Sequence, residues 1–161
     1  MSQAAIPLGM PRPLAEERGP IVIVGFFAMV LGMFMAVLDI QIVSSSLSQI
    51  QAGLSASPAE VSWVQTSYLI AEVVMIPLSG YLSRMMSTRV LFTISAAGFT
   101  LASLLCGTAT TIEEMIVYRA IQGFIGGAMI PTTFATSYLV FGIKRRNIAS
   151  AFVGLTVTLA N

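Results

Sequence analysis

The chain has 161 residues, of which 56% are hydrophobic and only 9% are charged, and it contains no histidine. Soluble domains carry about 25% charged residues, so this composition predicts a membrane protein. The net charge of +1 gives no sign of nucleic-acid binding. With one cysteine and no histidine, we expect no zinc, haem or iron–sulfur site, no other cofactor, and no enzyme that depends on a histidine dyad.

Long apolar segments follow one another from residue 20 onward, after an N-terminal tail at 1–19 that contains three prolines. A membrane-spanning helix needs about 20 apolar residues. The sequence predicts four such helices, at about 20–43, 58–81, 89–107 and 112–140. A fifth apolar segment at 148–161 is too short, because a helix rises about 1.5 Å per residue and the hydrocarbon core is roughly 30 Å thick. We therefore expect an all-α membrane protein in which residues 20–161 form a partial N-terminal transmembrane bundle, with the fifth helix incomplete.

Short polar sequences predict where these helices begin and bend. Ser57-Pro58-Ala59-Glu60 and Thr111-Ile112-Glu113-Glu114 each have the pattern of a capping box that opens a helix. Residues 44–57, which are rich in serine and glutamine, and residues 82–88 are predicted to be connections. Pro77 and Pro131 are expected to kink the second and fourth helices.

The distribution of lysine and arginine predicts the orientation of the helices, because cytoplasmic connections are enriched in these residues. All basic residues but one fall in the N-terminal tail and in the even-numbered connections: Arg12, Arg18, Arg84, Arg89, Lys144, Arg145 and Arg146. The first and third connections contain none. The N-terminus is therefore expected to be cytoplasmic.

Three charged side chains, Asp39, Glu72 and Arg119, fall inside the predicted spans. An arginine at the bilayer centre costs about 3 kcal/mol or more, so Arg119 is expected to face protein or water. Asp39 lies about 18 residues into the first helix. The fourth helix runs in the opposite direction, and Arg119 lies about 18 residues before an end of its membrane-spanning part near Ser137. Both are thus roughly 27 Å above the same membrane face, and we expect them to pair. Glu72 is expected near the middle of the bilayer.

Each of these charges has a structural explanation beside a functional one. Asp39 can be an interfacial cap near a helix end, Arg119 an anchor that locks helices together, and Glu72 a neutral hydrogen-bonding group. The functional interpretation is proton-coupled transport, because a buried carboxyl can bind a proton on one side of a membrane and release it on the other.

Glycines, methionines and aromatic residues are also found in the segments that carry these charges. Gln122, Gly123, Gly126 and Gly127 follow Arg119, and glycines let another helix approach closely or let backbone line a cavity. Methionine and aromatic side chains of the first two helices can line a cavity for apolar or cationic molecules, or can pack in the core or against lipid. These side chains are Met29, Met33, Phe34, Met35, Tyr68 and Met75.

Three motifs resemble the major facilitator superfamily, and within it the fourteen-span drug:proton antiporters of the EmrB/QacA subfamily. Leu38-Asp39-Ile40-Gln41-Ile42-Val43 is similar to the first-helix pattern L-D-x-T-I-V, with Gln41 in place of threonine. Arg119-Ala120-Ile121-Gln122-Gly123 is similar to the fourth-helix pattern R-x-x-Q-G. The stretch from Gly80 to Arg89 resembles the loop between the second and third helices of the superfamily.

The resemblance implies the N-terminal part of a multi-pass transporter in the bacterial inner membrane. Such a protein would export small-molecule drugs by alternating access, with the proton gradient as its energy source. Arg119 would belong to its proton-relay region, and Asp39 would act in proton coupling or substrate recognition, whereas the case for Glu72 rests on burial alone. Some Gram-negative relatives work with a periplasmic adaptor protein, which the resemblance adds as a partner.

The loop motif departs from the superfamily pattern at two positions. Gly80, Arg84 and Arg89 would belong to the loop that governs the conformational switch. Arg84 stands where the superfamily commonly has an aspartate, and Ser87 stands where it has a glycine. These departures weaken the charge contacts expected there.

Two other functions stay open on the sequence. One is a metabolite transporter of the same superfamily, which would be favoured by more intramembrane arginines than the single one present. The other is a truncated membrane protein that does not transport, such as an assembly or regulatory subunit.

Overall fold

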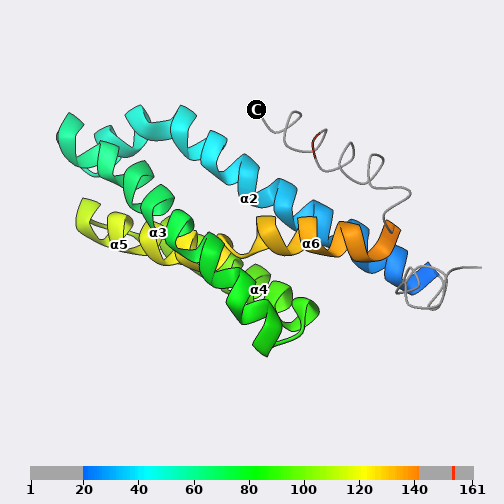
Figure 1. Cartoon of the computed structure of the whole chain (residues 1–161). Coiled ribbons are helices and arrows are strands. Elements are labelled where there is room, and N and C mark those ends of the chain that lie inside the picture. The colour runs from blue at the N-terminus through cyan, green and yellow to red at the C-terminus, as the bar shows by residue number, and fades with distance from the viewer. Residues whose placement is uncertain (1–19, 142–153, 155–161) are drawn as a thin grey trace, which may run out of the picture.

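The computed structural model describes residues 20–141 and Gly154, and the regular structure within them is entirely helical. The helices are α2 (Pro20–Gly53), α3 (Pro58–Met85), α4 (Thr88–Thr108), α5 (Ile112–Gly126) and α6 (Met129–Phe141) (Figure 1). α2, α3 and α4 are long and apolar enough to cross a membrane. α5 and α6 together cover the predicted fourth span. The predicted tail, and the predicted fifth segment apart from Gly154, lie outside the described residues.

The first helix is longer than its apolar segment, and the prediction that residues 44–57 are a connection was wrong. α2 continues to Gly53, and only Leu54–Ser57 connects it to α3. The extension is helical because it carries an apolar stripe at helical spacing, which packs on Val61, Val64 and Ile112 of α3 and α5. The stripe consists of Val43, Leu47 and Ile50, followed by Leu54 in the connection. Ser55 then takes a left-handed conformation, with φ of 52°, and turns the chain.

The predicted start of α3 is confirmed, whereas its end lies further along the chain than predicted. The Ser57 side chain accepts from the Glu60 amide, and the Glu60 side chain accepts from the Ser57 amide, so the capping box is complete. α3 passes through Pro77 as one helix and extends to Met85. The connection to α4 is therefore only Met86–Ser87, and most of the predicted turn at 82–88 is helix.

The second predicted capping box forms with a shift of one residue. The Thr111 side chain accepts from the Glu114 amide, as predicted. The Glu114 carboxylate, however, accepts from the amide and hydroxyl of Thr110. α5 therefore begins at Ile112 as the sequence indicated, but the Glu114 side chain bonds Thr110 in place of Thr111.

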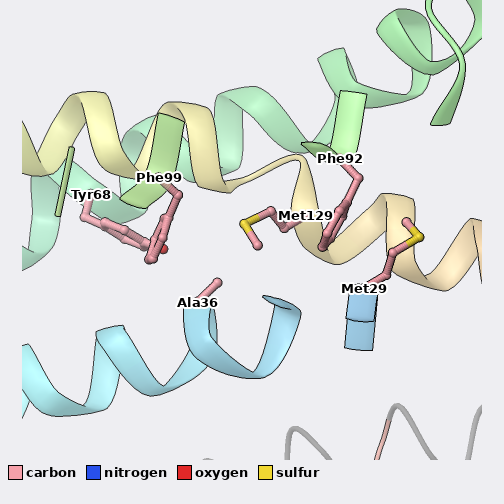
Figure 2. Packing of buried hydrophobic residues seen from close by; sticks show 6 residues of the cluster. All are labelled: Met29, Ala36, Tyr68, Phe92, Phe99 and Met129. Atoms are coloured by element: carbon pink, nitrogen blue, oxygen red, sulfur yellow. The ribbon is translucent and has the colours of Figure 1, made fainter. Parts of the chain in front are cut away.

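The fourth span is interrupted where the sequence predicted only a kink. α5 ends at Gly126 and α6 begins at Met129, so the break falls at Gly127 and Ala128. Pro131 explains its position, because a proline has no N–H for the carbonyl four residues earlier and its ring clashes with that carbonyl. That carbonyl belongs to Gly127. Figure 2 shows the break as a thin stretch of chain just before Met129.

The helices pack into two neighbouring groups. α3 and α5 make the most extensive interhelical contact, and α4 packs against α5. α6 instead runs beside the first half of α2 (Figure 1). Side chains from both groups meet in one apolar cluster, made of Met29, Ala36, Tyr68, Phe92, Phe99 and Met129 (Figure 2).

Candidate functional site

The buried centre of the molecule is an ion pair between helices α2 and α5. Arg119 is 1% exposed, and its Nη1 donates to Oδ2 of Asp39 at 2.5 Å. Arg119 Nη1 also donates to Oε1 of Gln122 at 2.7 Å, and Nε2 of Gln122 donates to Oδ1 of Asp39 at 3.2 Å. The three side chains thus form a closed polar triangle. The expected pairing of Asp39 with Arg119 is confirmed, and Asp39 is no interfacial cap, because α2 continues about four turns beyond it.

Helical spacing brings this triangle together. Arg119 and Gln122 are three residues apart on α5, so they lie on the same face of the helix. Asp39 reaches them from α2 and is partly exposed, with 18% of its side-chain surface accessible. The network therefore has one fully buried side, toward α3 and α5, and one more open side at the carboxylate.

Tyr68 of α3 covers one face of the Arg119 guanidinium. The Cζ atom of Arg119 lies 4.3 Å from the centroid of the Tyr68 ring, which is the geometry of a cation–π contact. Several polar atoms beside this contact are buried and have no hydrogen-bond partner in the part of the chain that the structure describes. They are Tyr68 Oη, Gln65 Oε1, and Nε and Nη2 of Arg119.

Glu72 lies one turn beyond Tyr68 on α3. Its side chain is buried, with 8% exposure, and no hydrogen bond to its carboxyl is formed by the described residues. Its backbone packs on Gly127, which lies about two turns beyond Arg119 along the chain. The structure therefore brings Asp39 and Arg119 together in one ion pair, whereas Glu72 lies on α3 one turn beyond Tyr68, the residue that contacts Arg119. No group of three histidine, cysteine, aspartate or glutamate side chains that could hold a metal occurs among the described residues.

The glycines after Arg119 set the distance between helices. A Cβ atom at Gly123 would clash with the carbonyl oxygen of Tyr68, and one at Gly127 would come within 3.0 Å of the carbonyl oxygen of Glu72. At Gly126 the obstacle would be the Phe99 ring, at 2.6 Å. The backbone of α3 thus approaches α5 and its C-cap closely at Tyr68 and Glu72, because Gly123 and Gly127 lack side chains.

The residues of the predicted switch loop lie in helices. Gly80 and Arg84 belong to α3 and Arg89 to α4. A Cβ atom at Gly80 would meet nothing within 4 Å, so this glycine provides no close helix contact among the described residues. No ion pair of Arg84 or Arg89 occurs within residues 20–141.

Of the residues predicted to line a cavity, Met29 lines one in the structure. Met29, Met33, Tyr68 and Met75 are buried in the core, whereas Met35 is 56% exposed. This cavity of about 820 Å³ lies between the first half of α2, the first half of α4 and the end of α6. Its lining is mostly apolar, with one charged residue, Arg89, and five hydroxyl-bearing residues: Ser87, Thr88, Thr93, Thr100 and Thr136.

Residues 29–161 match the Major Facilitator Superfamily. The chain belongs to this family. The colistin resistance protein EmrB of Acinetobacter baumannii is 53% identical over 134 residues, which are 83% of this chain and 26% of the relative. The fatty acid resistance protein FarB of Neisseria gonorrhoeae is 37% identical over 130 residues, 81% of this chain and 26% of the relative. The multidrug export protein EmrB of Escherichia coli is 32% identical over 143 residues, 89% of this chain and 28% of the relative.

Membership in the superfamily and the apolar helices make the chain a multi-pass protein of the bacterial inner membrane. The chain spans about a quarter of the length of the curated relatives it matches. The resemblance seen in the sequence motifs, to an EmrB-type member of the major facilitator superfamily, is therefore confirmed.

Proposed function

We propose that this chain is the N-terminal part of a proton-coupled multidrug efflux transporter that works by alternating access. The observation that carries the proposal is the fully buried Arg119, whose charge is balanced by Asp39 inside an apolar bundle. An intramembrane ion pair is costly and is typical of proton and substrate pathways. Relatives named for multidrug export and colistin resistance support drugs and toxic small molecules as the exported compounds.

In this proposal the proton gradient supplies the energy and no cofactor is required. Asp39, on the more open side of the network, takes up the proton, since a protonated carboxyl can no longer balance Arg119. Glu72 is the second titratable group in this proposal, because its side chain is buried one turn beyond Tyr68, whose ring lies against Arg119. Gly123, Gly126 and Gly127 hold α5 on its neighbours so that these groups stay in register.

The position of the basic residues supports a cytoplasmic N-terminus, with Arg84 and Arg89 on the cytoplasmic side. A periplasmic adaptor protein is proposed as a partner because of the resemblance to EmrB-type relatives. A metabolite transporter is the second candidate, but the relatives are named for export of drugs or resistance to toxic compounds, which favours efflux.

The test is drug efflux by the complete transporter in a strain that lacks its own pumps. Cells with the wild-type gene should accumulate less of a fluorescent cationic dye, and collapse of the proton gradient should abolish the difference. Asp39→Asn should lose this proton-dependent efflux, while Ser45→Ala, which lies on the same helix further from the ion pair, should keep it. Efflux that persists without a proton gradient would contradict proton coupling.

A further inference from the structure

The cavity between α2, α4 and α6 has its charge at one end. Arg89 lies in the first turn of α4, beside Ser87 and Thr88 at the start of that helix, and all three line the cavity. The threonines further along the lining already donate their hydroxyl protons to backbone carbonyls four residues earlier in their own helices; they are Thr93, Thr100 and Thr136. The cavity therefore combines one cationic end with a wall that is otherwise apolar.

The length of the cavity matches one leaflet of a bilayer. Arg89 and Thr100 mark its two ends on α4, and the helix rises about 16 Å between them. One leaflet contributes about 15 Å, which is half of a hydrocarbon core roughly 30 Å thick. The volume of about 820 Å³ is within the range usual for ligand pockets, about 300–1,000 Å³. The cavity is thus large enough for an acyl chain that runs along the helices.

The cavity is open on one side, because the residues along its edges are exposed. Ile21 of α2 is 79% exposed, and Ala97 of α4 is exposed as well. Arg89 is also exposed, and none of the acids in the described part of the chain lines the cavity or forms an ion pair with it. Since α2 and α4 are long and apolar enough to cross a membrane, the open side of this bundle faces the apolar layer. Arg89, at the start of α4, then lies at the level of the headgroups.

A cation at the end of an apolar cavity complements a ligand with an anionic head and an apolar tail. The guanidinium of an arginine pairs with phosphate through two parallel hydrogen bonds. The amides of Thr88 and Arg89, in the first turn of α4, have no acceptor within the helix and add to the attraction for an anion. Basic pockets between transmembrane helices on the cytoplasmic side bind anionic lipid headgroups. A cytoplasmic N-terminus, which the basic residues favour, puts Arg89 in that leaflet.

We propose that this cavity binds an anionic phospholipid of the cytoplasmic leaflet, with its phosphate on Arg89 and an acyl chain between α2 and α4. The lipid contacts three helices at once, because Thr136 and Val140 of α6 line the same cavity. A further protein helix packed here would need an acid of its own to balance Arg89, whereas the phosphate of a lipid supplies that charge. No residue of the Asp39–Arg119 ion pair lines the cavity, so the lipid site is separate from the proposed transport site.

The first experiment tests the headgroup with the purified complete transporter in detergent. Dioleoyl phosphatidylglycerol should raise the midpoint of thermal unfolding more than dioleoyl phosphatidylcholine, which has the same acyl chains but no net charge. Arg89→Ala should weaken the apparent affinity for phosphatidylglycerol about fivefold. Arg84→Ala is the matched control, because Arg84 is exposed at the same end of the bundle but does not line the cavity, and it should leave the affinity unchanged.

Two outcomes of this experiment would overturn the proposal. Equal losses in Arg89→Ala and Arg84→Ala would show that surface charge attracts the lipid without a defined site. Inorganic phosphate that stabilises the transporter as well as phosphatidylglycerol does would show that the acyl chain has no part in binding.

The second experiment locates the acyl chain by photocrosslinking in the same complete transporter. Phosphatidylglycerol with a diazirine on one acyl chain should label residues 21–29 and 89–100, which mass spectrometry of the peptides identifies. Gly25→Leu should reduce this labelling severalfold, because Gly25 lines the cavity and its added side chain has open space to fill. Gly107→Leu is the control, since that glycine is equally unobstructed but lies outside the cavity.

Absence of label from both segments, as when another helix of the transporter covers the cavity, would refute the lipid site. Neither experiment measures transport, so a failure of lipid binding leaves the proposed efflux function to its own test.

Discussion

At the scale of single residues, the site depends on the fully buried charge of Arg119. Arg119 is compensated by Asp39 and by the amide of Gln122, and its face is covered by Tyr68. Removing one partner of such a buried pair commonly costs about 3–5 kcal/mol, because the other charge stays behind uncompensated. The stability of the site therefore depends more on the balance of its charges than on any single hydrogen bond.

This balance predicts non-additive effects of substitutions. Asp39→Asn and Arg119→Ala should each destabilise the transporter strongly, whereas the double variant should lose about 1–3 kcal/mol less than the sum, because it leaves no unpaired charge. Thermal unfolding in detergent and residual efflux both measure this. Asp39→Asn combined with Arg84→Ala is the control, because Arg84 makes no contact with the ion pair and its effect should simply add. Strict additivity of the first pair would argue against direct coupling.

Part of the site could be predicted from the sequence, because charges in apolar segments must be compensated. The helical rise per residue was enough to predict that Asp39 and Arg119 lie at the same distance from one membrane face. The contact of Tyr68 with Arg119 did not follow, since it depends on how α3 is rotated against α5. The spacing of Tyr68 and Glu72 by one turn, and of Gln122 three residues after Arg119, was the available signal.

At the scale of helices, the register of α3 and α5 is fixed by two glycines that lie one turn apart. Gly123 faces the backbone at Tyr68, and Gly127 faces the backbone at Glu72. The glycine pattern in the sequence indicated close packing, but not which helix was the partner. The extension of α2 was missed because its polar composition obscured the apolar stripe from Val43 to Ile50.

Close backbone packing predicts that Gly123→Ala is destabilising. The added methyl group would overlap the Tyr68 carbonyl, which cannot move as a flexible side chain can, and such overpacking typically costs about 1–3 kcal/mol. Thermal unfolding in detergent is the measurement. Gly107→Ala is the matched control, because a Cβ atom there meets nothing within 4 Å, and it should be neutral or slightly stabilising. Equal stability of both variants would show that α3 and α5 can separate at little cost.

At the scale of the whole molecule, the helices and the bilayer differ in length. α2 has 34 residues and is therefore about 51 Å long, compared with a hydrocarbon core of roughly 30 Å. Its serine-rich last turns thus extend beyond the apolar layer, on the side opposite to Arg84 and Arg89. The connections Leu54–Ser57 and Ala109–Thr111 lie on that same side, because α3 and α4 each cross once between them.

This arrangement, with a cytoplasmic N-terminus, predicts which positions a membrane-impermeant thiol reagent can reach. In a Cys106→Ser background, Ala56→Cys and Ala109→Cys should be labelled in intact cells. Met86→Cys should be labelled only after the cells are broken, because its connection is expected in the cytoplasm. Labelling of Met86→Cys in intact cells, with protection of the other two, would reverse the orientation.

The break at Gly127 and Ala128 also divides the fourth span into two helices with different neighbours. α5, before the break, packs on α3 and α4, whereas α6, after it, lies along α2 and also contacts α3 and α4. A continuous fourth helix would join α5 and α6 into one rigid element. The interruption near Pro131 makes α5 and α6 separate helices, and the Asp39–Arg119 pair joins α2 to α5. Loss of that pair would leave α2 without an ion pair to α5, whereas the packing of α2 along α6 would remain.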